Sequence, residues 1–140
     1  MRRIRAKALV WVLRDGDAGP EALLLRRPAS RGGGWHPVTG KAHRGEAPEA
    51  AATREAREET GLDGPLVDLR WSHAFETPRG PVVEHSFLLD APRDARPRIS
   101  DEHVEFSWAP LDEARGRVEW EAHRRSLDLA LAAWGAARKG

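Results

Sequence analysis

The sequence predicts an α/β fold in which a mixed β-sheet lies between layers of helix. Two strand-like segments come first, a helix-like segment follows, and further strand-like segments lead to a closing amphipathic helix. Elements in this order are expected to form a sheet whose faces are covered by helices. With 140 residues, the chain suits one compact domain over residues 1–140 that buries a substantial core.

A hairpin is expected at the start of the sheet. Residues 4–13 become steadily more apolar, and the turn-forming stretch 15–20 separates them from a second strand over residues 21–27. The unbroken apolar stretch 22–25 predicts burial on both faces of this second strand. Basic residues precede the first strand as in a secretory leader, but the apolar run is too short and no small-residue cleavage site follows it.

A helix over residues 47–60 is predicted by its alanine, glutamate and arginine content. Pro48 is tolerated in a first turn, and Gly61 just past the end suits a left-handed cap. The segment has no large apolar residue, so only small side chains can bring it close to a neighbouring element. These are Ala51, Ala52 and Ala56, which lie next to the glutamates in helical projection.

The glutamates of this helix gather on one face. Glu55, Glu58 and Glu59 are three and four residues apart, so their like charges repel one another. A surface helix selected only for solubility would intersperse arginines there. Anionic carboxylates that face inward are costly unless a positive charge lies among them. A hard divalent cation with oxygen ligands, Mg2+ or Mn2+, would relieve that cost.

Later elements follow from alternation and helical spacing. They are a loop over 28–34, an extended segment over 35–41, strands over 65–75, 82–89 and 104–108, a helical turn over 110–114, and an amphipathic helix over 118–138. In the last helix Trp120, Leu127, Leu131 and Trp134 recur at helical spacing, and we interpret this stripe as core packing. His85 shares a strand face with apolar residues, so we expect it to pack in the core.

The stretch 40–62 resembles the Nudix box, G-x5-E-x7-R-E-U-x-E-E-x-G-U, in which U is aliphatic. The matching residues are Gly40, Glu46, Arg54, Glu55, Ala56, Glu58, Glu59, Gly61 and Leu62. Ala56 departs from the pattern only in being smaller than the usual aliphatic residue. The resemblance implies the Nudix fold, an α/β/α sandwich across essentially the whole chain. It also implies an enzyme that hydrolyses a nucleoside diphosphate linked to another moiety, by water attack at phosphorus.

The resemblance also implies a role for each residue of the box. Glu58 and Glu59 are expected to be metal ligands, and Glu55 either a further ligand or the group that orients or deprotonates the water. The backbone carbonyl of Thr39 or Gly40 would add another ligand. Glu46 and Arg54 are expected to form a structural ion pair, because a guanidinium fork positions a carboxylate well.

Family members often supply one more carboxylate from a late loop, as a metal ligand or a general base. Glu102 lies in a loop just ahead of the last strand, and we favour it for this role. Asp101 remains an alternative. Glu105 alternates with apolar neighbours and is expected to face the other side of the strand as a solvated side chain.

Substrate contacts are expected from cations and rings near the box. Arg26 or Arg27 lies at the exit of the second strand, and Lys41 directly follows the first glycine of the box. Each of these is also an ordinary surface charge. Trp35 could stack on a base, and the alternative is a tryptophan packed in the core.

Composition excludes several classes of protein. The net charge of +1 gives no basic field of the kind that marks a dedicated nucleic-acid binder. The chain has no cysteine, which excludes a disulfide framework, a thiol nucleophile and a cysteine-ligated zinc site, and weakly favours the cytoplasm. No run approaches the roughly 20 apolar residues of a membrane span. The resemblance to the Nudix family implies a small nucleotide-like substrate as the partner, while the oligomeric state stays open.

Three functions are compared. The run over 33–46, the segment 102–114 and the late tryptophan-containing helix are similar to bacterial Nudix enzymes that take dihydroneopterin triphosphate or dATP and release pyrophosphate. Glu102 and His103 ahead of Trp108 also resemble asymmetric diadenosine polyphosphate hydrolases, although those usually carry Lys-Gly-His where this chain has Thr39-Gly40-Lys41. A non-catalytic Nudix-like module that binds nucleotide or RNA would be expected to have lost carboxylates of the box, and this chain keeps them all.

Overall fold

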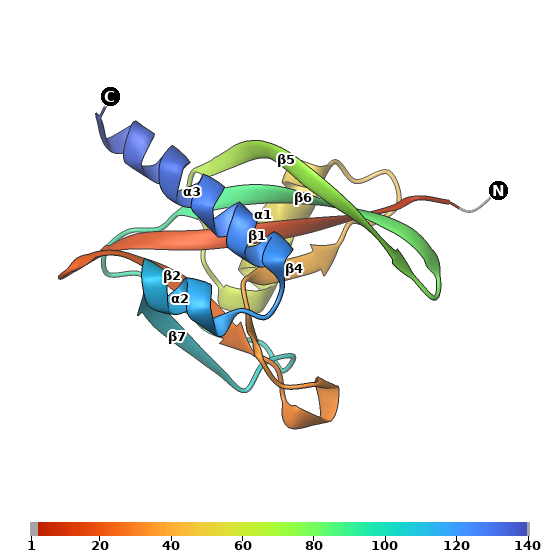
Figure 1. The fold of residues 1–140 in the computed structure, drawn as a ribbon, viewed down its shortest axis with the longest axis horizontal. Coiled ribbons are helices and arrows are strands. Elements are labelled where there is room, and N and C mark those ends of the chain that lie inside the picture. The colour runs from red at the N-terminus through yellow and green to blue at the C-terminus, as the bar shows by residue number, and fades with distance from the viewer. Residues whose placement is uncertain (1–2, 140) are drawn as a thin grey trace.

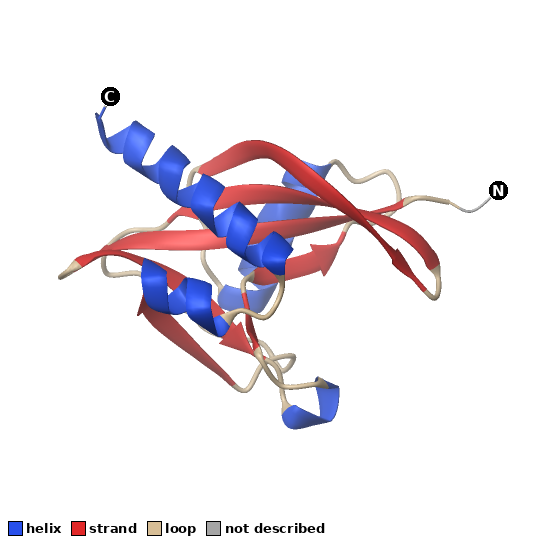
Figure 2. Cartoon of the chain, viewed as in Figure 1, coloured by secondary structure: helices blue, strands red, loops and turns tan. Residues whose placement is uncertain are grey.

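A seven-stranded sheet lies between helices on its two faces in the computed structural model, which describes residues 3–139 (Figure 1). The strands are β1 (Arg5–Gly16), β2 (Gly19–Arg26), β3 (Trp35–His36), β4 (Val38–Lys41), β5 (Leu66–Thr77), β6 (Gly80–Asp90) and β7 (Glu105–Pro110). The helices are the 3-10 turn η1 (Ala29–Arg31), α1 (Pro48–Thr60), α2 (Leu111–Arg117) and α3 (Glu121–Lys139). Figure 2 distinguishes the two kinds of element by colour.

The sheet is mixed, as the sequence predicted. Its order is β3-β2-β1-β6-β5, with β4 also paired to β1 and β7 also paired to β2. Strands β1 and β6 run parallel, and the other pairs are antiparallel. The predicted hairpin of β1 and β2 is confirmed, and Ala22, Leu23, Leu24 and Leu25 are buried as expected. Residues 1, 2 and 140 of the single domain expected over 1–140 lie outside the described part of the chain.

Alternation along β1 divides the core between the two faces of the sheet. Ala8, Val10 and Val12 face α1, whereas Leu9 and Trp11 face α2 and α3. Figure 1 shows α2 and α3 in front of the sheet and α1 behind it. The closing helix is anchored to the sheet by Trp11 of β1, whose indole Nε1 donates to the Ser126 Oγ at 2.9 Å.

Helix α1 ends where the sequence predicts. Pro48 opens it, and Gly61 closes it at φ 70° with its N–H donating to the Arg57 carbonyl. Its inner face carries Ala51, Ala52 and Ala56, which are fully buried against the sheet. Because these side chains are small, the glutamates beside them are drawn close to β4.

Strand β5 contains an irregularity that the alternation of its sequence does not reveal. The pairing with β6 shifts between Asp68 and Ser72, and Arg70 has a φ of 54°. Val67, placed by the simple alternation on the same face as Leu69, is 38% exposed, while Leu69 packs against the core beneath α3. Beyond the bulge, His73 and the rings on either side of it share one face of the strand.

The closing helix begins later than the sequence predicted, which corrects one expectation. Trp120 was assigned to an apolar stripe of this helix, but it precedes α3 and is 63% exposed. Leu127 and Trp134 are buried as expected, whereas Leu131 is 38% exposed. The residue just before a helix does not follow its periodicity, so Trp120 is free to point elsewhere. None of the described helices combines the length and the apolar character that a membrane crossing needs.

Candidate active site

A guanidinium holds the start of the box to helix α1. Arg54 donates from Nε and Nη2 to the two carboxylate oxygens of Glu46, at 2.9 and 3.0 Å, and from Nη2 to the Lys41 carbonyl at 2.8 Å. The His43 N–H also donates to Glu46, at 2.8 Å. These hydrogen bonds lower the pKa of Glu46 from 4.5 to about 2. The ion pair predicted from the box is therefore present, and it fastens the loop over 41–46 to the helix.

Glu55 lies directly against the backbone of Gly40. A Cβ added to Gly40 would overlap the Cγ, Cδ and Oε2 atoms of Glu55, so only glycine leaves room for this carboxylate. The same Arg54 donates from Nη1 to Glu55 Oε1 at 2.8 Å and to Glu58 Oε2 at 3.1 Å. The side chain of Glu55 is largely buried, whereas that of Glu58 is 57% exposed.

Glu59 is the most buried carboxylate of the box. The residue is 3% exposed, and its Oε1 atom has no hydrogen-bond partner. Burial raises its pKa well above the usual value, and the neighbouring Glu55 and Glu102 raise it further, while the Thr39 backbone opposes them. A carboxylate in this position is stabilised either by a proton or by a cation.

The residues of the box fit a divalent cation. The buried, unpartnered Oε1 of Glu59 and the adjacent Glu55 supply hard oxygen donors next to the backbone of Gly40. Within residues 3–139, no three acidic or histidine side chains already converge as a metal cluster, and the Arg54 guanidinium lies between Glu55 and Glu58. The metal ligands expected from the box therefore stay predictions.

Glu102 shares a small cavity with Glu59. Its volume is about 70 Å³, and it is lined by Arg27, Arg31, His36, Thr39, Glu59, Glu102 and His103. The late-loop carboxylate favoured from the sequence is thus near the box, and Asp101 does not line this cavity. Glu105 is exposed and paired with Arg26 at 2.6 Å, away from the cavity.

Two buried histidines form one wall of the same cavity. The Nε2 atoms of His36 and His103 are 3.0 Å apart, and His103 Nε2 lies 4.0 Å from Glu59 Oε1. Burial, followed by the charge of Arg27, lowers the pKa of His36 to about 3, and burial lowers that of His103. Both rings are thus neutral at pH 7. His36 was not singled out from the sequence, because its partners lie far along the chain.

A second cavity, of about 430 Å³, opens beside the first. It is lined by Lys7, Arg27, Thr39, His73, Phe75, Glu76, Glu84, Trp120 and His123. Arg27 and Thr39 line both cavities, so the two cavities adjoin, and Glu59 lies in the narrower one. Sequence reasoning missed most of these residues, although Glu84 interrupts an apolar strand and so offers a visible signal.

The structure separates the predicted substrate-binding residues. Arg27 lines both cavities, whereas Arg26 is held by Glu105. The guanidinium groups of Arg26 and Arg117 lie 5.9 and 4.1 Å from the ring centroid of Trp35, which lines neither cavity. Roles in substrate binding stay predictions, and this geometry favours Arg27.

Lys41 belongs to a third hollow, a basic groove of about 600 Å³. Its charged and ionisable lining consists of Arg3, Arg5, Lys7, Lys41, His43, Arg44, Arg79 and Glu46. The single acidic group among them, Glu46, is already bound by Arg54. Lys7 and Phe75 also line the second cavity, so the two hollows adjoin.

A family model described as the NUDIX domain matches residues 3–130. The chain belongs to the Nudix family. The match spans the helix with its glutamates, the Glu46 ion pair and the strands that line both cavities.

Solved structures of other Nudix proteins share the fold. The Ap4A hydrolase of C. elegans superimposes with a TM-score of 0.81 at 22% identity, over 95% of this chain and 98% of that one. The dihydroneopterin triphosphate pyrophosphohydrolase of E. coli gives 0.77 at 23% identity, over 88% and 92%. The MutT protein of Methanosarcina mazei Go1 gives 0.71 at 27% identity, over 91% and 92%. The first two likenesses establish the fold alone.

A curated relative is more similar in sequence but is much longer. An octanoyltransferase of Myxococcus xanthus is 42% identical over 120 residues, which are 81% of this chain and 34% of that protein. The Nudix chain thus spans about a third of the length of this relative. The name of the whole relative therefore carries no activity over to this chain.

Proposed function

We propose that this Nudix enzyme uses Mg2+, or Mn2+, to hydrolyse a nucleoside triphosphate or dihydroneopterin triphosphate, with release of pyrophosphate. The observation that carries the proposal is that the two cavities share Arg27 and Thr39 in their linings. Phe75 and Trp120 line the wider cavity, Arg27 lines both cavities, and Glu59 lines the narrower one. A substrate would therefore place its ring system in the wider cavity, its polyphosphate beside Arg27, and its metal-bound end next to Glu59.

The box carboxylates would hold the cation. Glu55, Glu58 and Glu59 are the side-chain ligands we propose, with the backbone carbonyl of Gly40 beside them. A divalent ion supplies charge neutralisation for the polyphosphate and acidifies the attacking water. To reach it, Glu58 would exchange its hydrogen bond to Arg54 for the ion, which its exposure allows.

The hydrolytic step needs a proton acceptor and an anchor for the phosphates. A water oxygen bonds to the α phosphorus, its proton passes to Glu55 or Glu102, and the bond to the leaving pyrophosphate breaks. Glu55 is positioned for this role by Gly40 and Arg54. Arg27 binds phosphate oxygens at the junction of the cavities, where its charge opposes the repulsion between the substrate and Glu59.

Product identification tests the proposal. The purified enzyme is incubated with Mg2+ and, separately, dATP, dGTP, dihydroneopterin triphosphate, diadenosine tetraphosphate and ADP-ribose, with a chelator control. We expect pyrophosphate and a monophosphate from at least one triphosphate, and no turnover with the chelator. If the folded enzyme with Mg2+ turned over none of the five compounds, the proposal would be wrong.

The basic groove favours a second candidate, an asymmetric diadenosine polyphosphate hydrolase. Six lysines and arginines line the groove, and it adjoins the second cavity at Lys7 and Phe75. A substrate with a second nucleotide would extend into the groove, where its phosphates meet positive charge. Release of ATP and AMP from diadenosine tetraphosphate, faster than pyrophosphate from any triphosphate, would favour this candidate.

A further inference from the structure

A buried ion pair lies on the wall of the second cavity. Glu84 of β6 is directly opposite Lys7 of the parallel strand β1, and the two groups approach to 3.8 Å. Glu84 is 3% exposed, and its other oxygen lies 3.4 Å from His73 Nε2. Further along the same face, β1 and β6 carry Leu9, Trp11 and Leu88 in the core beneath α3. The polar pair thus replaces apolar packing at the point where the cavity opens.

The energetics of this pair point to a ligand. Burial raises the pKa of Glu84, and the charges of Lys7 and Arg27 only partly oppose that effect. Buried ion pairs seldom add stability relative to well-packed apolar residues. Perturbed carboxylates that line a cavity are instead typical of functional sites. A structural pair would also be expected to have closer contacts than 3.4 and 3.8 Å.

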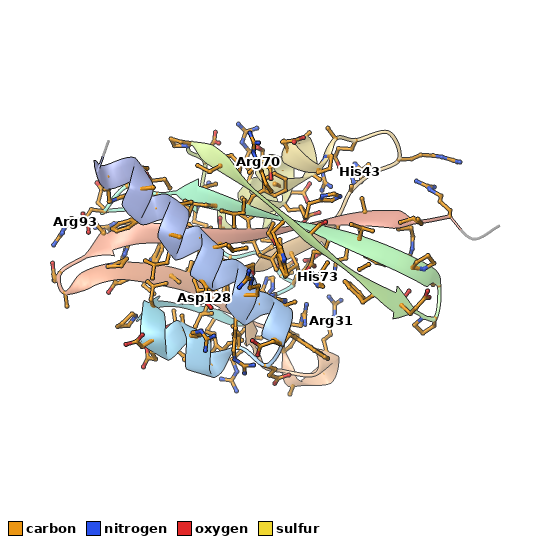
Figure 3. All side chains as sticks on the ribbon, turned by 45° about the horizontal axis from the view of Figure 1, so that its top comes forward. Arg31, His43, Arg70, His73, Arg93 and Asp128 are labelled. Carbon is orange, nitrogen blue, oxygen red and sulfur yellow. The ribbon has the colours of Figure 1, made fainter. Side chains whose placement is uncertain are left out.

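Four ring side chains, His73, Phe75, Trp120 and His123, line the cavity with Glu84, and Trp71 stacks behind His73 outside that lining. Trp71, His73 and Phe75 stack along β5, with successive centroids 5.4 Å apart and interplanar angles of 21° and 25°. Trp120 lines the same cavity from the segment ahead of α3. Figure 3 shows His73 beside the first turn of α3, between β5 and that helix. A planar heterocycle suits these walls, since aromatic faces stack on bases.

We propose that Glu84 and Lys7 select a base that carries the 2-aminopyrimidin-4-one edge shared by guanine and pterins. This edge presents an amino group, a ring N–H and a carbonyl oxygen in a row. The two Glu84 oxygens accept from the amino group and the ring N–H, while the Lys7 ammonium donates to the carbonyl oxygen. Adenine offers one amino donor next to a ring nitrogen that accepts, so it leaves one carboxylate oxygen unmatched.

The same assignment also determines the orientation in which the substrate binds. A polyphosphate is repelled by Glu84 and attracted by Arg27, which lines both the wider and the narrower cavity. The base end therefore lies toward β6, and the phosphates lie toward Glu59. This inference rests on the proposed hydrolysis of a triphosphate and names the class of base.

Binding without metal separates the inference from the hydrolysis itself. Affinities of dGTP, dITP and dATP are measured by calorimetry in the presence of a chelator; dITP lacks only the 2-amino group of dGTP. We expect dGTP to bind about 10- to 100-fold more tightly than dITP and dATP. Equal affinities, or a preference for dATP, would overturn the inference. Tighter binding of dGTP, with no turnover of any of the five compounds in the presence of Mg2+, would leave the inference standing and refute the proposed hydrolysis.

Turnover measurements with Mg2+ then test whether Glu84 causes the preference for dGTP over dATP. Glu84→Gln exchanges one acceptor for a donor, so we expect the ratio of kcat/KM for dGTP over dATP to fall at least about 10-fold. Glu105→Gln, an identical change outside both cavities, should leave this ratio unchanged. An unchanged ratio in a folded Glu84→Gln variant would refute the assignment. Comparing dGTP with dihydroneopterin triphosphate shows which source of the edge, guanine or pterin, the cavity prefers.

Discussion

Gly40 gives the sharpest test of how the box positions its carboxylates. In Gly40→Ala the new Cβ would overlap three atoms of the Glu55 side chain, where ordinary contact begins at about 3.4 Å. Glu55 must therefore move by roughly 1 Å or more, a displacement that can cost about 100-fold in rate when the group acts on the reacting atoms. Such a loss corresponds to about 2.7 kcal/mol of transition-state stabilisation.

Stability should change far less than activity. The overlapped atoms belong to the end of a flexible side chain, which can swing aside, and Gly40 does not have a positive φ. We expect the free energy of unfolding of Gly40→Ala to stay within about 1 kcal/mol of that of the wild type. Steady-state kcat/KM for the preferred triphosphate and denaturant unfolding of the same preparation measure the two effects.

Gly116 supplies the matched control. A Cβ there meets nothing within 4 Å, so Gly116→Ala should keep full activity and gain about 0.4 to 1 kcal/mol of stability. If Gly40→Ala kept the kcat/KM of the wild type, the close placement of Glu55 would have no part in the reaction. If Gly40→Ala instead unfolded, the glycine would serve the fold rather than the site.

Three further predictions concern the ion pair, the buried carboxylate and the cavity. Glu46→Gln should be less stable than the wild type at pH 7, and the difference should shrink as the pH falls from 4.5 toward 2, because the low folded-state pKa of Glu46 stabilises the protein only while the group is ionised. For Glu59, the folded state retains a proton that the unfolded state loses above pH 4.5, so the metal-free protein should lose stability as the pH rises. Because Mg2+ takes the place of that proton, the increase in Tm caused by Mg2+ should grow over the same pH range. Trp120→Ala should raise KM about 10-fold with an unchanged Tm, because this exposed ring lines the cavity.

Each of these predictions has a result that contradicts it. Denaturation at pH 7 and pH 3 checks Glu46→Gln, and a stability difference that persists at low pH would contradict the ion-pair account. Thermal melts with Mg2+ and with a chelator at pH 6 and pH 8 check Glu59, and an increase in Tm that is larger at pH 6 would contradict metal binding there. A fall in Tm for Trp120→Ala, without a change in KM, would assign that ring to packing.

The parts of the site that are local in sequence were predictable. The ends of α1 follow from Pro48 and Gly61, and the Glu46 ion pair joins residues eight positions apart. The role of Gly40 was less visible, because its contact with Glu55 exists only after the sheet and the helix pack together.

The cavity was not predictable, because its walls come from distant segments. Lys7 meets Glu84 only through the parallel pairing of β1 with β6, a long-range contact that no local pattern encodes. Trp120 was assigned to the core because helical spacing does not reveal where a helix begins. The choice between Arg26 and Arg27 likewise depended on Glu105, which reaches Arg26 across β2 and β7.

The central claim is that the α1 carboxylates act through a divalent ion on a phosphoanhydride. The most direct measurement compares Mg2+-dependent turnover of Glu58→Gln with that of Glu49→Gln, an identical change at an exposed site in the first turn of the same helix. We predict a loss of about 100-fold or more for Glu58→Gln at an unchanged Tm, and wild-type turnover for Glu49→Gln. Full activity of Glu58→Gln at saturating Mg2+ would contradict the claim.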